Sequence, residues 1–189
     1  LAVLKSQINP HFLYNTLHNI DALIYEDRDK ASKSLEKLSD IMRYMLSDTQ
    51  SEFVDLQKEL DYLENYLALE QLRLKNDRFL QYSVNGDCIG LQIAPMILIP
   101  FVENAFKHSV DSNVENGIVI SIAIDDNRLS FVCENRFDQS ETDKDKGHGI
   151  GLENVRKRLS LIYNKKHNLS VNTVNSVYKV NLTLELNGN

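Results

Sequence analysis

Apolar side chains recur at helical spacing near the start of the chain. Steps of four, three and four residues predict one face of an amphipathic helix over about residues 2–25. The apolar face is formed by Leu13, Leu17, Ile20 and Ile24. At roughly 100° per residue, the opposite face carries His11, Asn15 and His18.

A second helix with the same spacing follows a polar turn at 26–29. Its apolar positions are Ala31, Leu35, Leu38, Met42 and Met45. Two antiparallel helices cannot bury both apolar faces alone, so pairing with a second copy into a four-helix bundle is the economical arrangement. We therefore expect a homodimer, with residues 1–52 as the dimerising helical hairpin.

A third helical pattern begins at Leu56, after a polar segment at 47–55, and beyond it the period changes to that of strands. We place a domain junction here and expect residues 53–189 to form a layered α/β sandwich, which makes the fold class α+β. Strands are expected at 79–84, 89–93, 117–124, 129–133, 168–173 and 178–186, and further helices at 96–110 and 150–163. The charged segment 136–146 has no period and is expected to be a loop.

Composition narrows the classes of function. The formal charge of −6 disfavours nucleic acid or an anionic membrane surface as the partner, because both attract clustered Lys and Arg. Two isolated cysteines fit a reducing compartment. The longest apolar stretch, 93–102, is too short to cross a bilayer. The chain begins inside a helical pattern without Met, so we expect it to continue a longer protein, and any membrane contact to lie in segments absent here.

One candidate phosphate site is glycine-rich. Gly147, Gly149 and Gly151 alternate where a loop becomes a helix, and glycines there let backbone N–H groups approach an anion at the positive helix end. Taken alone, the motif is equally typical of a tight flexible turn. It lacks the Lys-Ser/Thr of a P-loop and does not directly follow a strand, so neither a P-loop nor a Rossmann turn is indicated.

A second candidate is helical. Asn104, Lys107 and His108 stand at i, i+3 and i+4, so an amide oxygen for a metal ion and two potential cations for phosphates share one helix face. Alone, this is also the pattern of a solvated helix face. Its occurrence about forty residues before the glycine motif favours a nucleotide site.

The third candidate is His11. Pro10 inside a helical pattern removes a backbone hydrogen bond, which predicts a kink beside an exposed histidine. A neutral imidazole has one basic nitrogen and can act as a nucleophile near neutral pH. Taken alone, such a histidine is more often an ordinary surface residue.

These segments, in this order, resemble the sensor histidine kinases of the LytS/YesM type, whose transmitter begins with a QINPHFLYNTLN-like motif. Here residues 7–20 read QINPHFLYNTLHNI. The similarity continues through LQKELDYLENYLALEQLR at 56–73, IAPMILIPFVENAFKHSV at 93–110 and GHGIGLENVRKRLSLIY at 147–163. It covers nearly the whole chain.

The resemblance implies a function as well as a fold. The ATP-binding half would have the Bergerat (GHKL) fold, and His11 would accept the γ-phosphoryl group of ATP and pass it to a response-regulator aspartate. Asn15 matches a position that helps related kinases orient water for dephosphorylating the partner. The chain would be the cytoplasmic part of a bacterial inner-membrane sensor.

The resemblance also assigns the nucleotide contacts. Asn104 would hold Mg²⁺, while Lys107 and His108 would contact phosphates, and residues 136–146 would form a lid. The remaining contacts would come from Glu134, Asn135, Gly147, Gly149, Gly151 and Leu152.

Two departures from the wider pattern leave alternatives open. Where an adenine-binding Asp followed by Asn-Gly is expected, residues 134–136 read Glu-Asn-Arg, so Glu134 or Asn135 must serve. A degenerate transmitter that binds nucleotide or a partner without kinase activity is therefore an alternative, and an ATPase using Glu103 as base is another. Phe12 stands where many other histidine kinases place an acidic base directly after the phosphoacceptor, so the general base is unassigned.

Overall fold

The computed structural model describes residues 10–110, 113–138 and 150–188. The helices are α1 (Pro10–Glu26), α2 (Arg28–Ser47), the short 3-10 helix η2 (Asp48–Gln50), α3 (Leu56–Gln71), α4 (Ile99–His108) and α5 (Ile150–Ile162). The strands are β1 (Val54–Asp55), β2 (Leu80–Asn85), β3 (Leu91–Ile93), β4 (Ile118–Asp125), β5 (Arg128–Arg136), β6 (His167–Val174), β7 (Val177–Glu185) and β8 (Asn187–Gly188).

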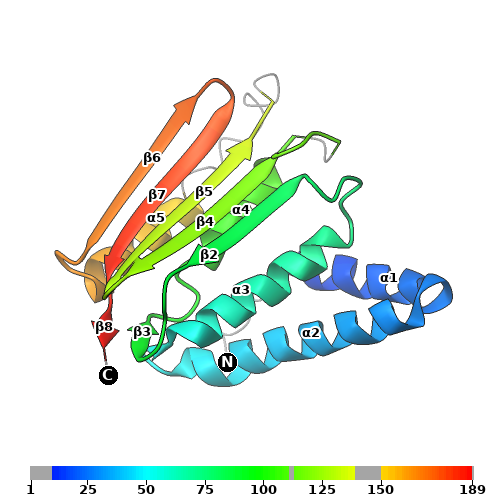
Figure 1. Cartoon of the computed structure of the whole chain (residues 1–189), viewed down its shortest axis with the longest axis horizontal. Coiled ribbons are helices and arrows are strands. Elements are labelled where there is room, and N and C mark those ends of the chain that lie inside the picture. The colour runs from blue at the N-terminus through cyan, green and yellow to red at the C-terminus, as the bar shows by residue number, and fades with distance from the viewer. Residues whose placement is uncertain (1–9, 111–112, 139–149, 189) are drawn as a thin grey trace.

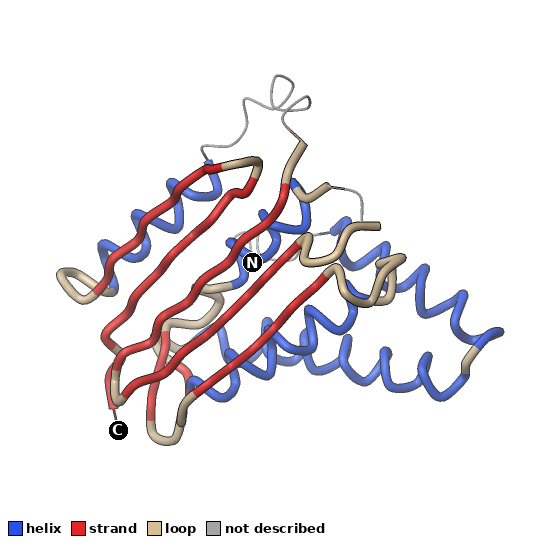
Figure 2. Tube along the Cα trace, turned by 45° about the horizontal axis from the view of Figure 1, so that its top comes forward, coloured by secondary structure: helices blue, strands red, loops and turns tan. Residues whose placement is uncertain are grey.

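A five-stranded sheet of order β2-β4-β5-β7-β6 forms one layer of the C-terminal half. Strands β2 and β4 run parallel, and the other neighbours are antiparallel. Helices α4 and α5 lie against one face of this sheet, and α1 to α3 lie beyond its β2 edge (Figures 1 and 2). The α+β class, with a helical hairpin followed by an α/β sandwich, is therefore confirmed.

Alternation along β5 decides which side chains face the helices. Phe131 packs against Phe101 of α4, with ring centroids 5.9 Å apart, and the Cys133 thiol lies 3.8 Å from the Phe101 carbonyl oxygen. Because successive side chains of a strand point to opposite faces, Asn135 shares the helix-covered face with Phe131 and Cys133. Glu134 belongs to the other face.

The hairpin connection is shorter than predicted. Helix α1 ends at Glu26 and α2 begins at Arg28, because the Asp27 carboxylate accepts a hydrogen bond from the Lys30 N–H at 2.9 Å and caps α2 directly. The predicted turn at 26–29 is thus a single residue. The kink predicted at Pro10 falls at the limit of the described residues.

The face of α1 that is buried within the chain differs from the predicted one. Phe12, Thr16 and Ile20 are buried, whereas Leu17 and Ile24 are 45% and 47% exposed. The reason is that α1 packs against both α2 and α3, which rotates its buried face toward Phe12. A second apolar row is thereby left at the surface.

The hairpin packs directly on α3. The rings of Tyr44 in α2 and Tyr62 in α3 stack with centroids 4.8 Å apart, and the Lys37 ammonium donates to the Asn65 side-chain oxygen at 3.2 Å. One continuous apolar core includes residues of both halves. The predicted domain boundary between residues 52 and 53 falls in the connection between η2 and β1. Because the hairpin and the C-terminal half pack against each other across this connection, the boundary remains a prediction.

A small second sheet was not predicted. Strands β1, β3 and β8 pair in the order β1-β3-β8. Two of them are only two residues long, which is too short to show an alternating pattern. Helix α4 also begins later than predicted, because Met96 has a φ of 56° and cannot belong to a right-handed helix.

Candidate functional site

His11 lies in the first turn of α1 and is exposed. The amide nitrogen of Asn15, one turn later, lies 3.2 Å from Nδ1 and 3.3 Å from Nε2 of the His11 ring. Phe12 is buried, and its ring stacks on Tyr66 of α3 with centroids 4.5 Å apart. The packing of Phe12 therefore fixes α1 while leaving the His11 ring at the surface.

Asn104 of α4 lines a cavity of about 50 Å³ between α4, α5 and the sheet. Apart from Tyr178, the other lining residues are apolar. They are Pro100 and Phe101 of α4, Leu152 and Val155 of α5, and Tyr178 and Val180 of β7. Two of the predicted site residues, Asn104 and Leu152, are thus brought together from segments about fifty residues apart in sequence.

Lys107 and His108 occupy the last turn of α4. Lys107 is exposed, and His108 is half-buried. The Asn135 side-chain N–H donates to the His108 carbonyl oxygen at 3.4 Å, so the end of α4 is tied to β5. Asn135 therefore sits next to the helix that carries the predicted metal and phosphate contacts.

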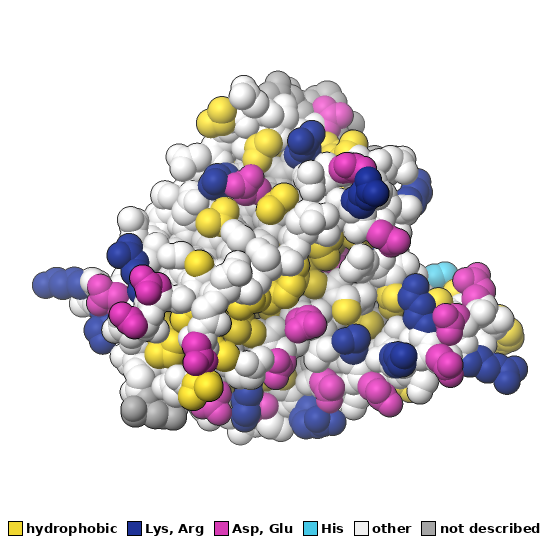
Figure 3. Space-filling model, viewed as in Figure 1, with side chains coloured by type: hydrophobic (Ala, Val, Ile, Leu, Met, Phe, Trp, Pro, Cys, Tyr) yellow, Lys and Arg dark blue, Asp and Glu magenta, His cyan; other side chains and the backbone are white. Residues whose placement is uncertain are grey.

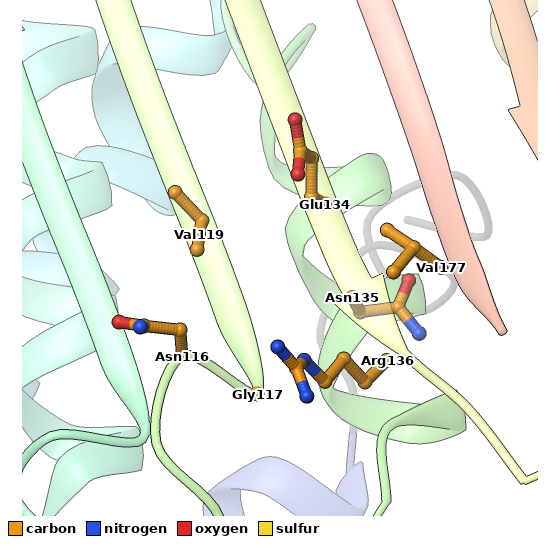
Figure 4. Close-up of a pocket in the computed structure, with 7 residues that line it drawn as sticks. All are labelled: Asn116, Gly117, Val119, Glu134, Asn135, Arg136 and Val177. Carbon is orange, nitrogen blue, oxygen red and sulfur yellow. The ribbon is translucent and has the colours of Figure 1, made fainter. Parts of the chain in front are cut away.

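Glu134 lies on the opposite side of the sheet from Asn104. Its carboxylate pairs with the Lys179 ammonium at 2.7 Å, and it lines a second cavity of about 130 Å³ (Figure 4). Val119 and Lys179 are its cross-strand neighbours. Of the two residues proposed for the adenine contact, only Asn135 has its side chain on the helix-covered face.

The glycine motif is described only at its end. Gly147 and Gly149 lie outside the described residues, as do positions 139–146 of the predicted lid. Gly151 lies in the first turn of α5. The described start of α5 agrees with the prediction that a helix follows the glycines.

Comparison with known proteins agrees with these motifs. The profile of the family described as histidine kinase matches residues 1–79. Sensor protein LytS of Staphylococcus haemolyticus is 33% identical over 180 residues, covering 86% of this chain and 30% of the relative. The sensor histidine kinase YpdA of Escherichia coli is 31% identical over 172 residues, covering 86% of this chain and 30% of the relative.

This chain belongs to the LytS-type sensor histidine kinases. It spans about 30% of the length of the relatives just named. A solved histidine kinase domain from the Erythrobacter litoralis EL346 blue-light activated kinase has a TM-score of 0.48 at 15% identity, covering 98% of this chain and 92% of that one.

In this histidine kinase chain, the start of α4 is held by a carboxylate from α3. Glu59 is 1% exposed, and its two oxygens accept N–H bonds from Met96 at 2.9 Å, Ile97 at 3.1 Å and Leu98 at 3.5 Å. The N-cap of α4, Leu98, has no side chain able to cap the helix. Glu59 therefore satisfies the backbone donors that precede α4 from another helix.

The same carboxylate also reaches the hairpin. The Tyr44 hydroxyl of α2 donates a short hydrogen bond to Glu59. Burial raises the pKa of Glu59, and the bonds from Tyr44 and the three amides oppose this shift. Glu59 thus links α2, α3 and the helix that carries Asn104.

Helix α5 holds the segment before α4 from the other side. The Arg158 guanidinium donates to the Pro95 and Met96 carbonyl oxygens at 2.6 and 3.2 Å. The Tyr163 hydroxyl accepts from the Ala94 N–H at 2.8 Å. The position of Asn104 therefore depends on contacts from α3, from α5 and from Tyr163, which directly follows α5.

No helix within 10–110, 113–138 and 150–188 combines the length and apolarity needed to cross a membrane. The same described ranges contain no cluster of three or more His, Cys, Asp or Glu side chains suited to a metal ion. A metal site at Asn104 would therefore need most of its ligands from a bound molecule or water.

Proposed function

We propose that this chain is the transmitter of a two-component sensor, in which Mg-ATP phosphorylates His11 and the phosphoryl group then passes to a response-regulator aspartate. The proposal is supported by the arrangement of the histidine and the cavity. An exposed histidine stands on a helical hairpin that packs on α3, and α3 meets α4, the helix that presents Asn104 to a cavity, in a chain of the histidine kinase family. If the chain only hydrolysed ATP to water, the hairpin that carries His11 would be unexplained.

The residues around the cavity fit Mg-ATP. Mg²⁺ usually keeps several waters and binds through one or two protein oxygens together with substrate phosphates, so a single amide oxygen from Asn104 is a sufficient protein ligand. Lys107 supplies a positive charge three residues further along the exposed side of α4. Leu152 and Val155 supply an apolar wall for the base. Asn135 does not line this cavity, but it lies beside the end of α4, where its side-chain oxygen can accept a hydrogen bond from an adenine amino group.

Phosphoryl transfer asks the protein mainly for positioning and charge stabilisation. His11 supplies the nucleophilic nitrogen, and Asn104 and Lys107 orient and neutralise the phosphates. His11 is anchored on the Phe106 side of α4, since Phe12 stacks on Tyr66 and Tyr66 meets Phe106 edge-on at 6.4 Å. Asn104 instead faces α5 and β7. Transfer therefore requires the hairpin to change position relative to α4, or a second copy to provide the cavity.

The test is transfer of label from Mg-ATP carrying a labelled γ-phosphate. We expect acid-labile, base-stable label on the wild type and none on His11→Gln. His18→Gln, which changes an exposed histidine on the same helix, is the matched control and should be labelled like the wild type. Bound ATP without label on a folded dimer would instead support the degenerate transmitter.

We propose that the hairpin dimerises into a four-helix bundle. The outer surface of the hairpin carries large apolar side chains that no other described residue covers. They are Tyr14, Leu17, Ile24, Tyr25, Leu35 and Leu46, between 45% and 87% exposed. Leu17 and Ile24 are seven residues apart, as are Leu35 and the half-buried Met42, which is the spacing of a helical-bundle interface.

Leu35→Glu is expected to weaken the dimer about 30-fold or more, because a two-fold interface receives the buried charge twice. Sedimentation equilibrium measures the change. The control is Lys33→Glu, which alters an exposed side chain on the opposite side of α2. It changes the net charge more than Leu35→Glu does, yet it should leave the dimer intact. Equal weakening by both substitutions would contradict the proposed interface.

The proposed partner is a response-regulator protein, and the proposed location is the cytoplasmic side of a bacterial inner membrane. On the face shown in Figure 3, acidic and basic side chains are interspersed. Such a surface, with a net charge of −6, fits a protein partner better than nucleic acid.

A further inference from the structure

Tyr178 of β7 is a second polar side chain in the cavity that Asn104 lines. It is half-buried, and Val180, two residues further along the strand, lines the same cavity. Residues i and i+2 of a strand share one face, so β7 forms the floor of the cavity on the side of the sheet that α4 and α5 cover (Figure 1). In the proposed function Asn104 is engaged by Mg²⁺, which leaves the Tyr178 hydroxyl to meet another part of the nucleotide.

A tight turn decides that Tyr178 faces the helices. Strands β6 and β7 are joined by two residues, Asn175 and Ser176, whose φ values are 50° and 61°. Two successive positive φ angles are typical of a type I′ turn, which matches the twist of the flanking strands and fixes their register. A shift of one residue would turn the Tyr178 side chain to the opposite face of the sheet. The turn therefore holds this tyrosine on the side of the sheet where Asn104 lies.

Asn135 is the direct neighbour of Tyr178 in the pairing of β5 with β7. The Cβ atoms of opposite residues in an antiparallel pair lie about 5 Å apart and point to the same face. The Asn135 amide nitrogen donates to the His108 carbonyl oxygen at 3.4 Å, so its side-chain oxygen is the end left to accept. Burial raises the pKa of Tyr178, with Arg156 acting in the opposite direction, so the hydroxyl keeps its proton at neutral pH and can donate. An acceptor and a donor thus stand side by side.

Adenine presents the complementary pair of groups. Its amino group donates a hydrogen bond, and the adjacent ring nitrogen N1 accepts one. Guanine carries an oxygen and an N–H in these two positions, so its oxygen would face the side-chain oxygen of Asn135. Proteins read bases through such edge contacts while apolar side chains cover the flat ring, and Leu152 and Val155 supply the apolar side chains here.

We propose that Tyr178 is a base-binding residue of the nucleotide site: its hydroxyl donates a hydrogen bond to N1 of adenine, while the Asn135 oxygen accepts from the neighbouring amino group. This inference rests on the proposed function. It assigns recognition of the base to two paired strands, apart from the phosphates that Asn104 and Lys107 meet. Loss of the hydroxyl should therefore weaken binding of the nucleotide and leave the rate of phosphoryl transfer from bound ATP unchanged.

The test combines Tyr178→Phe with 1-deaza-ADP, an analogue that carries a C–H in place of N1. Titration calorimetry in the presence of Mg²⁺ measures the Kd of each pair. ADP should bind Tyr178→Phe about 3- to 10-fold more weakly than the wild type, which is the range for one neutral hydrogen bond. The wild type should prefer ADP over 1-deaza-ADP by a similar factor, whereas Tyr178→Phe should bind the two alike within about twofold. Tyr82→Phe, which alters a half-buried tyrosine of β2 outside the cavity, should keep the full preference for ADP.

Labelling kinetics separate binding of the base from catalysis. Tyr178→Phe should raise the KM for ATP by a factor similar to that for the Kd, with the rate at saturating ATP within about twofold of the wild type. The same preference for ADP in Tyr178→Phe as in the wild type would overturn the role of Tyr178, while labelling that depends on His11 would leave the kinase function intact. A wild type that binds ADP and 1-deaza-ADP equally well would also overturn it, even if the variant failed to fold. A wild type that binds no ADP would contradict both this inference and the proposed function.

Discussion

Replacing Asn104 with alanine is expected to lower the rate of His11 phosphorylation by about 100-fold or more. In the proposed function, the amide oxygen would be the protein's own contact to the Mg²⁺ that neutralises the phosphates. Removing one charge-stabilising group from a phosphoryl or acyl transfer site costs roughly 10²–10³ in rate. Asn104 is half-buried and lines the cavity, so the fold should survive. Initial rates of labelling at saturating ATP measure the effect.

The control is Asn172→Ala, which removes an exposed asparagine of β6 and should leave the rate unchanged. Raising the Mg²⁺ concentration should partly restore the activity of Asn104→Ala and leave the control unaffected. A rate within threefold of the wild type at limiting Mg²⁺ would show that Asn104 does not hold the metal.

Glu59→Ala is expected to lower the free energy of unfolding by roughly 3–5 kcal/mol. A buried donor that loses its acceptor lowers the stability by about 1–3 kcal/mol. The substitution leaves the Tyr44 hydroxyl and the amides before α4 without their acceptor. Urea unfolding followed by circular dichroism measures the loss. Because α4 carries Asn104, the affinity for Mg-ATP should fall as well.

Glu64→Ala on the same helix provides the comparison, since Glu64 is exposed, and it should change stability by less than about 0.5 kcal/mol. Tyr44→Phe removes only the bond from α2 and should cost less than Glu59→Ala. Equal stability of Glu59→Ala and the wild type would mean that the segment before α4 is held by Arg158 and Tyr163 alone.

The elements of the fold were largely readable from periodicity. Long helices and strands such as α2, α3, β4 and β5 repeat a pattern over many residues, and each was predicted within a few positions. Strands β1 and β8 have too few residues to repeat anything. The buried face of α1 was misjudged because Phe12 packs on Tyr66 of α3, a contact that no local pattern contains.

The candidate site could be proposed from the sequence where its side chains share one helix. Helical spacing alone groups Asn104, Lys107 and His108. The choice between Glu134 and Asn135 required the structure, because only the sheet shows which of the two side chains faces α4. Glu59 was missed because acidic residues in a helix usually face water. A signal was present, since Glu59 lies three residues after Leu56 and four before Leu63, on the apolar face.

Locating the phosphoryl group within the chain is the decisive measurement. After incubation with Mg-ATP, the protein would be digested at neutral to alkaline pH and its peptides sequenced by mass spectrometry. We predict a phosphorylated peptide that contains His11, with the modification on that ring and absent when Mg²⁺ is chelated. A phosphoryl group on any other residue, with His11 unmodified, would contradict the assignment of His11 as the phosphoacceptor.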